Sequence, residues 1–222
     1  MNVQSNIQNL RKDIPPGVKL VCVSKFHPTE SIMEAYNAGE RIFGESRVQE
    51  LIAKQPQLPD DIQWHFIGHL QTNKIKFIAP FVSLIHGVDS LKVLRTINTQ
   101  AKKVDRTVSC LLQVHIADEK TKFGFSEEDL FELLSSDAFK QLTHVSVKGL
   151  MGMATFTDDM NQVRNEFKFL KNLFDKVKSE FFLDDENFSE LSMGMSQDYQ
   201  IAIEEGSTMI RIGTSIFGER DY

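Results

Sequence analysis

The sequence predicts an α/β fold, a single (β/α)8 barrel of the TIM type with an extra helix at its N-terminus. Short apolar segments that suit strands alternate with helical patterns along the chain, which is typical of a parallel sheet covered by helices. Eight strand segments are expected, the number that such a barrel needs. The length of 222 residues is also normal for one α/β barrel. A doubly wound open sheet is the alternative architecture.

The strand segments are apolar runs with little polar alternation, as expected of strands that are buried on both faces. They are expected at residues 18–24, 41–44, 63–67, 81–85, 107–116, 145–151, 188–192 and 207–212. The chain shows no linker, repeat or low-complexity segment, so residues 1–222 are expected to form one domain.

Apolar residues at spacings of three and four, together with capping residues, predict the helices. They are expected at residues 2–12, 29–39, 45–54, 70–79, 160–181 and 196–206, with two more that begin at Ser90 and Ser126. Thr29 and Ser196 are expected to cap their helices, and Ser126 with Asp129 has the spacing of a capping box. The Phe-rich face of the 160–181 helix is expected to pack in the core rather than to hold a cofactor.

Composition and charge exclude several classes of function. A net charge of -6 and a pI of about 5.5 argue against general nucleic-acid binding, which needs a basic surface. No apolar run approaches the roughly 20 residues of a membrane span, and the N-terminus lacks the basic and apolar regions of a signal peptide. A cytoplasmic protein is therefore expected. Cys22 and Cys110 are expected to be buried free thiols, with a disulfide or a catalytic thiol as the alternative.

Lys25 is the first candidate for chemistry. The apolar run that begins at Leu20 ends on this lysine, at the carboxyl end of a central strand, where α/β folds bind their ligands. A partly desolvated lysine amine is a usable nucleophile, and the chemistry that most needs one is a Schiff base to an aldehyde, above all pyridoxal 5'-phosphate (PLP). The alternative is a lysine that extends from the strand end to water.

Two later strand ends predict a phosphate site. Leu191–Ser196 follows the seventh strand segment and Arg211–Ser215 the eighth, and barrels often bind phosphate between these two loops. Free backbone N–H groups and the dipole of a short helix favour an anion there. The residues suited to it are the glycines Gly194 and Gly213 and the hydroxyl-bearing Ser192, Ser196 and Thr214.

Other polar residues near strand ends leave alternatives open. Arg211 lies inside the last strand, where an arginine must face a ligand or pair with an acid such as Glu45. The methionines of Met151–Met153 suit either the support of a flat ring or core packing. His65 and His69 have the i, i+4 spacing of a metal pair, but this spacing brings two ligands together in a helix and not in a strand, so no metal site is expected.

These motifs together resemble the pyridoxal phosphate homeostasis protein family. The resemblance runs through Val23–Lys25, Phe43–Ser46, Trp64–Gly68, Leu70–Lys74, Gly149–Met153, Leu191–Asp198, Arg211–Thr214 and Ile216–Gly218. It covers nearly the whole chain, from about residue 18 to 220. The family is similar to the N-terminal barrel of alanine racemase and binds PLP without a demonstrated reaction.

The resemblance implies roles for eight residues. Lys25 would hold PLP as a Schiff base, Arg211 would face the pyridine nitrogen, and Met193 would lie near the ring. The phosphate would lie at Ser196, Gly213 and Thr214, with Ser192 nearby. Ser46 stands where the family often has an asparagine, so the hydrogen bond of that amide is in doubt here.

The expected function is that of a PLP-binding carrier or regulator in intracellular PLP homeostasis, not an enzyme. Its expected partners are PLP and recipient apo-PLP enzymes, and it is expected to act as a monomer. The alternative is a racemase-like PLP enzyme that acts on amino acids, but a racemase adds a second domain with a catalytic tyrosine. None of the tyrosines Tyr36, Tyr199 and Tyr222 is at a strand end. A sugar-phosphate barrel enzyme without PLP is a third alternative, and it leaves Lys25 unexplained.

Overall fold

Eight parallel strands close into a barrel in the computed structural model, which describes residues 2–118 and 123–219. The strands are β1 (Lys19–Val23), β2 (Ile42–Glu45), β3 (Gln63–Phe66), β4 (Leu84–Val88), β5 (Val108–Gln113), β6 (Val145–Met151), β7 (Glu190–Ser192) and β8 (Met209–Ile212). Each strand pairs with the next in the chain, and β8 pairs with β1 from Lys19↔Met209 to Cys22↔Ile212. This last pairing confirms the barrel, and the open-sheet alternative is wrong.

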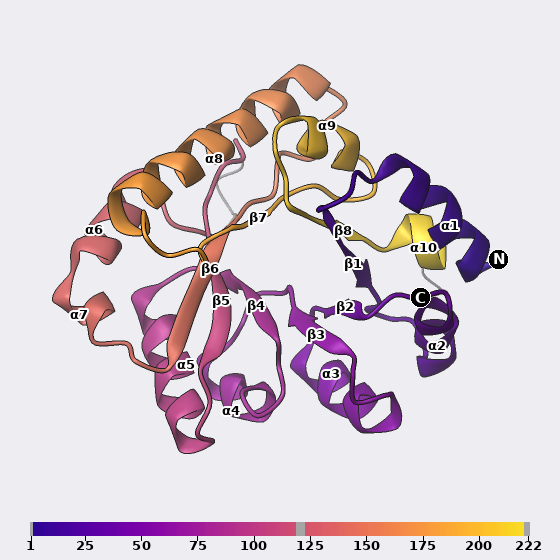
Figure 1. Cartoon of the computed structure of the whole chain (residues 1–222), viewed down its shortest axis with the longest axis horizontal. Helices are drawn as coiled ribbons and strands as arrows, with labels where there is room; N and C mark the ends of the chain where they lie inside the picture. The colour runs from indigo at the N-terminus through magenta and orange to yellow at the C-terminus, as the bar shows by residue number, and fades with distance from the viewer. Residues whose placement is uncertain (1, 119–122, 220–222) are drawn as a thin grey trace.

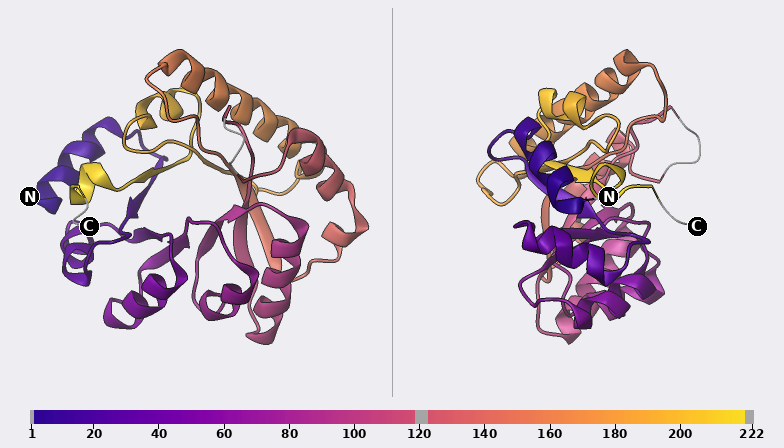
Figure 2. Two further views of the ribbon diagram at one scale, coloured as in Figure 1. Left: turned by 180° about the vertical axis from the view of Figure 1, so that it is seen from behind. Right: turned by 90° about the vertical axis from the view of Figure 1, so that its right-hand side faces the viewer.

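Helices surround the strands, as Figure 1 shows. They are α1 (Val3–Asp13), α2 (Thr29–Asn37), α3 (Val48–Lys54), η1 (Gln55–Gln57), η2 (Thr72–Lys74), α4 (Ile75–Ile78), α5 (Leu91–Lys103), α6 (Glu127–Ser135), α7 (Asp137–Lys140), α8 (Met160–Phe181), α9 (Tyr199–Glu204) and α10 (Thr214–Phe217). The extra N-terminal helix α1 lies beside α10 in Figures 1 and 2, and Asn6 Nδ2 donates to Ile216 O at 2.9 Å. In the described ranges, no helix is both long and apolar enough to cross a membrane.

Ser90 and Ser126, where helices were predicted to begin, are N-caps, whereas the caps predicted at Thr29 and Ser196 are wrong. Ser90 accepts from Val93 N, and Ser126 accepts from Asp129 N at 3.1 Å, as a capping residue should. Thr29 is the first residue of α2 rather than its cap, because Pro28 occupies the N-cap position. Ser196 does not cap α9 either, since this helix begins three residues later and its N-cap is Asp198.

Several boundaries differ from the prediction for local reasons. The strand expected at 81–85 is found at Leu84–Val88, because the N–H groups of Phe81 and Val82 still donate to Ile78 O of α4. The helix expected from residue 45 begins at Val48, since Glu45 continues β2. The helix expected at 70–79 is reduced to η2 and α4, and the short helices α7 and α10 were not predicted.

The strands are buried on both faces, as predicted. Along β1, Leu20 and Cys22 pack outward against the helices, while Val21 packs inward with a small lumen cluster. The lumen cluster consists of Val21, Leu84, Leu111, Met151 and Met209. Cys22 and Cys110 are buried free thiols, which confirms that prediction. Burial raises the pKa of Cys110 to about 12, so its reactive thiolate form is disfavoured.

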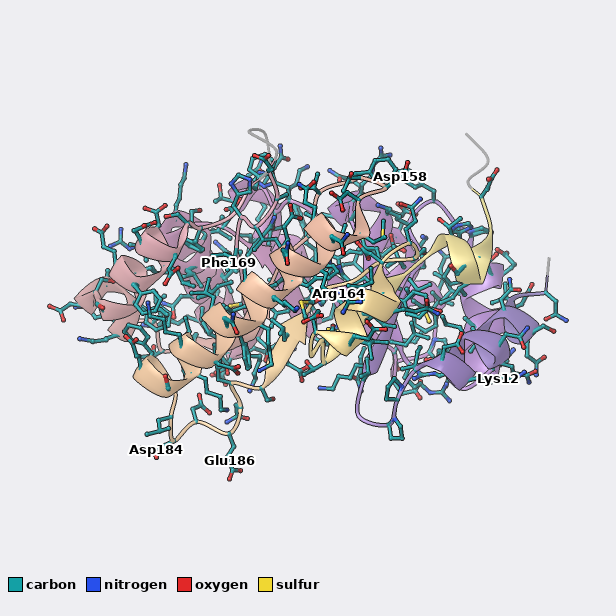
Figure 3. The ribbon with its side chains drawn as sticks, turned by 90° about the horizontal axis from the view of Figure 1, so that it is seen from above. Lys12, Asp158, Arg164, Phe169, Asp184 and Glu186 are labelled. Atoms are coloured by element: carbon teal, nitrogen blue, oxygen red, sulfur yellow. The ribbon has the colours of Figure 1, made fainter. Side chains whose placement is uncertain are left out.

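The long helix α8 packs as expected, with Phe167 and Phe174 buried in the outer core. It also holds α9 in place. Arg164 of α8 lies where the two helices meet (Figure 3), and its guanidinium pairs with Glu204 and Glu205, each at 2.5 Å. This contact fixes the segment that follows β7.

Candidate cofactor site

A cavity of about 630 Å³ opens at the carboxyl ends of the strands. Its walls come from the segments after β1, β2, β3, β6, β7 and β8, so residues far apart in the sequence meet there. Six of the eight predicted site residues line it: Lys25, Ser46, Ser196, Arg211, Gly213 and Thr214. A closed parallel barrel explains this gathering, because all its strands point their carboxyl ends to the same mouth.

Ser192 and Met193 are not on the cavity wall. Ser192 points into the barrel lumen below the cavity, where its Oγ accepts from Arg211 Nη1 at 2.6 Å. Met193 follows directly, and its fully buried side chain packs in the outer core between strands and helices. The expectation that Met193 lies near a bound ring is thus corrected, because neighbouring residues of an extended segment point to opposite faces. The methionines on the wall are Met153, Met160 and Met195.

Lys25 sits in a tight turn two residues after β1 and is half-buried. The next residue, Phe26, has a φ of 69°, an uncommon conformation for a side chain of this size. Backbone hydrogen bonds hold the turn: His27 N donates to Ser24 O at 3.1 Å, and Phe26 N donates to Glu50 Oε1 at 2.6 Å. The position of Lys25 at the cavity is therefore set by the local backbone.

A buried ionic network lies behind this turn. Lys54 Nζ donates to Ser24 O at 2.9 Å and to Glu45 Oε1 at 2.8 Å, and Ser24 Oγ donates to the same carboxylate oxygen at 2.7 Å. Burial raises the pKa of Glu45, while the Lys54 charge acts against this rise. Glu45 is therefore the partner of Lys54, and the alternative that it pairs with Arg211 is wrong. Sequence reasoning missed Lys54, which looked like the last residue of an ordinary amphipathic helix.

Arg211 brings a buried positive charge to the cavity. Its Nη1 donates to Ser192 Oγ, and its Nη2 donates to Gly152 O at 3.1 Å, so both acceptors are neutral. Burial lowers the pKa of Arg211 to about 10, with the Asp198 charge acting in the opposite direction, so the guanidinium remains charged near neutral pH. A buried cation held by neutral groups favours a ligand that offers an acceptor or a negative charge.

The two loops of the predicted phosphate site reach the same wall. Ser196 follows β7, and Gly213 with Thr214 leads into α10. A Cβ on Gly213 would come within 3.2 Å of Val23 O, so a glycine suits this close contact between β8 and β1. The His27 ring stacks on Phe217 of α10 with 5.0 Å between ring centroids. This contact, which the sequence analysis missed, ties α10 to the turn that carries Lys25.

His65 and His69 do not share a partner. His69 Nδ1 lies 3.2 Å from Asp89 Oδ2, whereas His65 Nδ1 lies 3.0 Å from Nε2 of His86 in the lumen. The sequence analysis did not predict the contact between His65 and His86. His65 lies inside the strand predicted at 63–67, and His86 directly follows the strand predicted at 81–85. The contact depends on strand register, which the sequence does not show. His65 of β3 pairs with Leu84 of β4, and His86 lies two residues further along β4 on the same inward face.

Comparison with known proteins decides the family. Residues 1–221 match the family model described as alanine racemase, N-terminal domain. A pyridoxal phosphate homeostasis protein of Aquifex aeolicus is 42% identical over 205 residues, which cover 92% of this chain and 88% of the relative. The chain belongs to the pyridoxal phosphate homeostasis protein family. Another member, from Schizosaccharomyces pombe, is 39% identical over 92% of this chain and 85% of its own length.

Solved structures agree with this membership. PipY of Synechococcus elongatus without PLP superposes with a TM-score of 0.91 and 37% identity, covering 97% of this chain and all of PipY. The same protein with PLP bound superposes with a TM-score of 0.88 and 36% identity, again covering 97% of this chain. An alanine racemase of Clostridium difficile has a TM-score of 0.78, but at 14% identity it shares the fold alone, over 57% of the racemase chain.

Proposed function

We propose that this protein binds PLP in the cavity at the carboxyl ends of its strands and serves in PLP homeostasis. The observation that carries the proposal is that Lys25 and Arg211 line one cavity with the hydroxyl-bearing Ser196 and Thr214. An amine, a buried guanidinium and hydroxyl groups are the donors that suit an aldehyde, a pyridine nitrogen and a phosphate. The names of the relatives and the PLP-bound structure of PipY support the same cofactor.

The roles of the residues follow from their positions. Lys25 holds the cofactor as a Schiff base, and Arg211 donates toward the pyridine nitrogen. Ser196, Gly213 and Thr214 hold the phosphate, aided by the first N–H groups of α10, which have no acceptor within the helix. Ser46 lines the same cavity and replaces the amide common in the family with a hydroxyl. PLP itself supplies the aldehyde, and its ring acts as an electron sink when its nitrogen is protonated.

We propose a carrier or regulator rather than an enzyme. A guanidinium that faces the pyridine nitrogen opposes protonation of that nitrogen by like-charge repulsion, which makes the ring a poorer electron sink. On this proposal the protein acts in the cytoplasm as a monomeric, single-domain barrel over residues 1–222 and passes PLP to apo-PLP enzymes. Sustained racemisation of L-alanine that disappears in Lys25→Ala would instead favour a racemase-like enzyme.

The test of the Schiff base is chemical labelling. The purified protein, loaded with PLP, is expected to absorb in the near-visible range, and borohydride should fix the cofactor to the peptide that contains Lys25. Lys25→Ala should lose this absorbance band but keep some PLP, because the phosphate contacts remain. Lys74→Ala is the matched control and should behave as the parent protein. A label found mainly on the Lys74 peptide by mass spectrometry would refute the assignment.

A further inference from the structure

A continuous line of polar side chains runs down the lumen of the barrel from the cofactor cavity. Arg211 of β8 donates to Ser192 Oγ of β7 at 2.6 Å, and Ser192 Oγ lies 3.1 Å from Nδ1 of His86 on β4. His86 Nε2 lies 3.0 Å from Nδ1 of His65 on β3. All four residues are buried, with at most 5% of their surface exposed. Buried polar groups in such an arrangement are expected to be fully hydrogen-bonded.

The line connects the two ends of the barrel. Arg211 lies on the wall of the upper cavity. His65 lies on the wall of a second cavity, of about 280 Å³, at the amino ends of the strands, which Lys19 and Glu190 also line. The four residues, called here the lumen chain, therefore span the barrel from one mouth to the other.

Both histidines of the lumen chain are neutral. Burial lowers the pKa of His65 to about 3, with the Lys19 charge acting in the same direction. Burial also lowers the pKa of His86 well below its usual range, aided by His65 and Arg211. A neutral imidazole has one donor nitrogen and one acceptor nitrogen. Each histidine can therefore accept a hydrogen bond at one ring nitrogen and donate one from the other, which gives the chain of hydrogen bonds a direction.

The donor at the top sets that direction. Arginine can only donate, so Ser192 Oγ must accept from Arg211. In the part of the chain that the structure describes, the other hydrogen-bond partner of Ser192 Oγ is His86 Nδ1. If Ser192 donates its hydroxyl hydrogen to Nδ1, then His86 donates from Nε2 to His65 Nδ1. The reverse direction would leave the buried hydroxyl hydrogen without an acceptor, which is unfavourable in a buried site.

We propose that His86 and His65 are positioning residues for Arg211. By accepting the Ser192 hydroxyl hydrogen, His86 polarises Ser192 Oγ into a stronger acceptor for the guanidinium. His65 in turn fixes the tautomer of His86. The lumen chain thereby holds Arg211 toward the cavity and leaves its positive charge uncompensated. A carboxylate partner could also hold the guanidinium, but it would cancel that charge. The consequence for PLP rests on the function proposed above.

The direction of the chain can be measured without PLP. Apo-protein labelled with ¹⁵N-histidine should show, for both His65 and His86 at pH 7, the nitrogen shifts of a neutral ring protonated at Nε2. The His65→Gln and His86→Asn variants assign the two signals. A ring protonated at Nδ1 in either residue, or a doubly protonated ring, would overturn the proposal.

Two substitutions of one residue then test positioning. His86→Asn keeps an acceptor, Oδ1, at the place of Nδ1, whereas His86→Phe removes it. The side-chain N–H signals of Arg211 in the apo-protein should stay protected from exchange with solvent in His86→Asn and lose this protection in His86→Phe. Leu84→Ala is the matched control, because Leu84 lies on the same strand and faces the same lumen without a hydrogen bond.

PLP titration completes the test. His86→Phe should bind PLP about tenfold more weakly, the effect of one misplaced hydrogen bond, while His86→Asn and Leu84→Ala stay within about threefold of the parent protein. His86→Phe and Leu84→Ala could instead lose Arg211 protection and PLP affinity to the same extent. The histidines would then contribute only packing, and the proposal would be overturned. If the parent protein failed to bind PLP, the proposed function would fail, while the apo-protein spectra would still decide the direction of the chain.

Discussion

At the scale of single residues, the structure keeps charges in its core in two ways. Glu45 and Lys54 form an ion pair behind the turn that carries Lys25. Arg211 is held by neutral acceptors and keeps its charge available to the cavity. The first arrangement fixes a backbone turn, and the second prepares a binding group. Both place buried charge beside the mouth where the cofactor is proposed to bind.

Removal of Lys54 should therefore destabilise the protein strongly. Lys54→Met leaves the fully buried Glu45 carboxylate without its cation, and such losses amount to about 3–5 kcal/mol. Lys171→Met is the control, because the ion pair of Lys171 with Asp175 is exposed and is worth about 0.5 kcal/mol or less. The measurement is urea unfolding at pH 7. Similar losses for the two variants would show that Glu45 does not depend on Lys54.

Lys25 and Arg211 were expected at the strand ends and line the cavity there, whereas their roles toward PLP stay a prediction. The sequence marked both residues because a charge at or inside an apolar strand is unusual and needs a reason. Lys54 was missed because a lysine at the end of an amphipathic helix normally reaches water. Its burial depends on the packing of α3 against β2, which no local pattern reveals.

At the scale of elements, strong periodicity gave accurate boundaries and weak periodicity did not. The predicted strand 145–151 and helix 160–181 agree with β6 and α8 at both ends. The strand after α4 was placed three residues early, because the apolar Phe81 and Val82 belong to the turn that ends the helix. Apolar residues at a helix end and at a strand start look alike in sequence.

The segment between β7 and α9 depends on one glycine. Gly194 has a φ of +96°, and a Cβ there would lie 2.6 Å from Ala202 Cβ of α9. Gly194→Ala should thus both strain the backbone and push α9 away, with a loss of about 2–4 kcal/mol in unfolding free energy. Gly39→Ala is the matched control, since Gly39 also has a positive φ but nothing within 4 Å of a Cβ. It should lose about 1 kcal/mol. Equal losses would mean that α9 adapts without cost.

The loops after β7 and β8 lead to a prediction about affinity. If they hold the phosphate, PLP should bind far more tightly than pyridoxal, although both offer the same aldehyde to Lys25. Charge-assisted hydrogen bonds contribute about 1.5–3 kcal/mol each, so the loss of several should weaken binding by about a hundredfold or more. Titration of the apo-protein with both compounds is the measurement.

Thr214→Ala serves as the internal check of this affinity prediction. It removes one hydroxyl from the cavity wall and leaves the backbone N–H groups in place. Its PLP affinity should fall by less than the difference between PLP and pyridoxal, while its pyridoxal affinity should not change. Equal binding of the two aldehydes by the parent protein would place the phosphate elsewhere.

At the scale of the whole molecule, barrel closure does what sequence motifs cannot specify. It brings β1 next to β8, so that Lys25 and Arg211, 186 positions apart in the chain, share one cavity. The alternation of strand and helix patterns along the sequence predicted eight strands. It therefore also predicted that the carboxyl ends of the strands gather at one mouth of the barrel. The lumen contacts were not predictable, because they depend on the register between neighbouring strands, which a single sequence does not fix.

The lumen histidines should make the whole fold sensitive to acid. Their pKa values lie below the ordinary 6.5 because burial disfavours the charged ring, so the unfolded chain binds protons that the folded chain cannot. Stability from each histidine is complete above pH 6.5 and is lost as the pH falls from 6.5 toward 3, the folded pKa of His65. The slope is about 1.4 kcal/mol per pH unit for each ring.

Glu45 acts with the opposite sign. Burial raises its pKa, so its contribution to stability is complete below the ordinary 4.5 and is lost as the pH rises through its folded value. Because two histidines lose stability on acidification and one carboxyl group gains it, the free energy of unfolding should fall between pH 6.5 and 5. Urea unfolding at pH 7.5, 6.5, 5.8 and 5 measures this loss. The double variant His65→Gln/His86→Asn should show a shallower slope of stability against pH than the parent, and Leu84→Ala, which removes no titratable group from the lumen, should not. A parent protein equally stable at pH 6.5 and 5 would mean that the lumen histidines take up protons in the folded state.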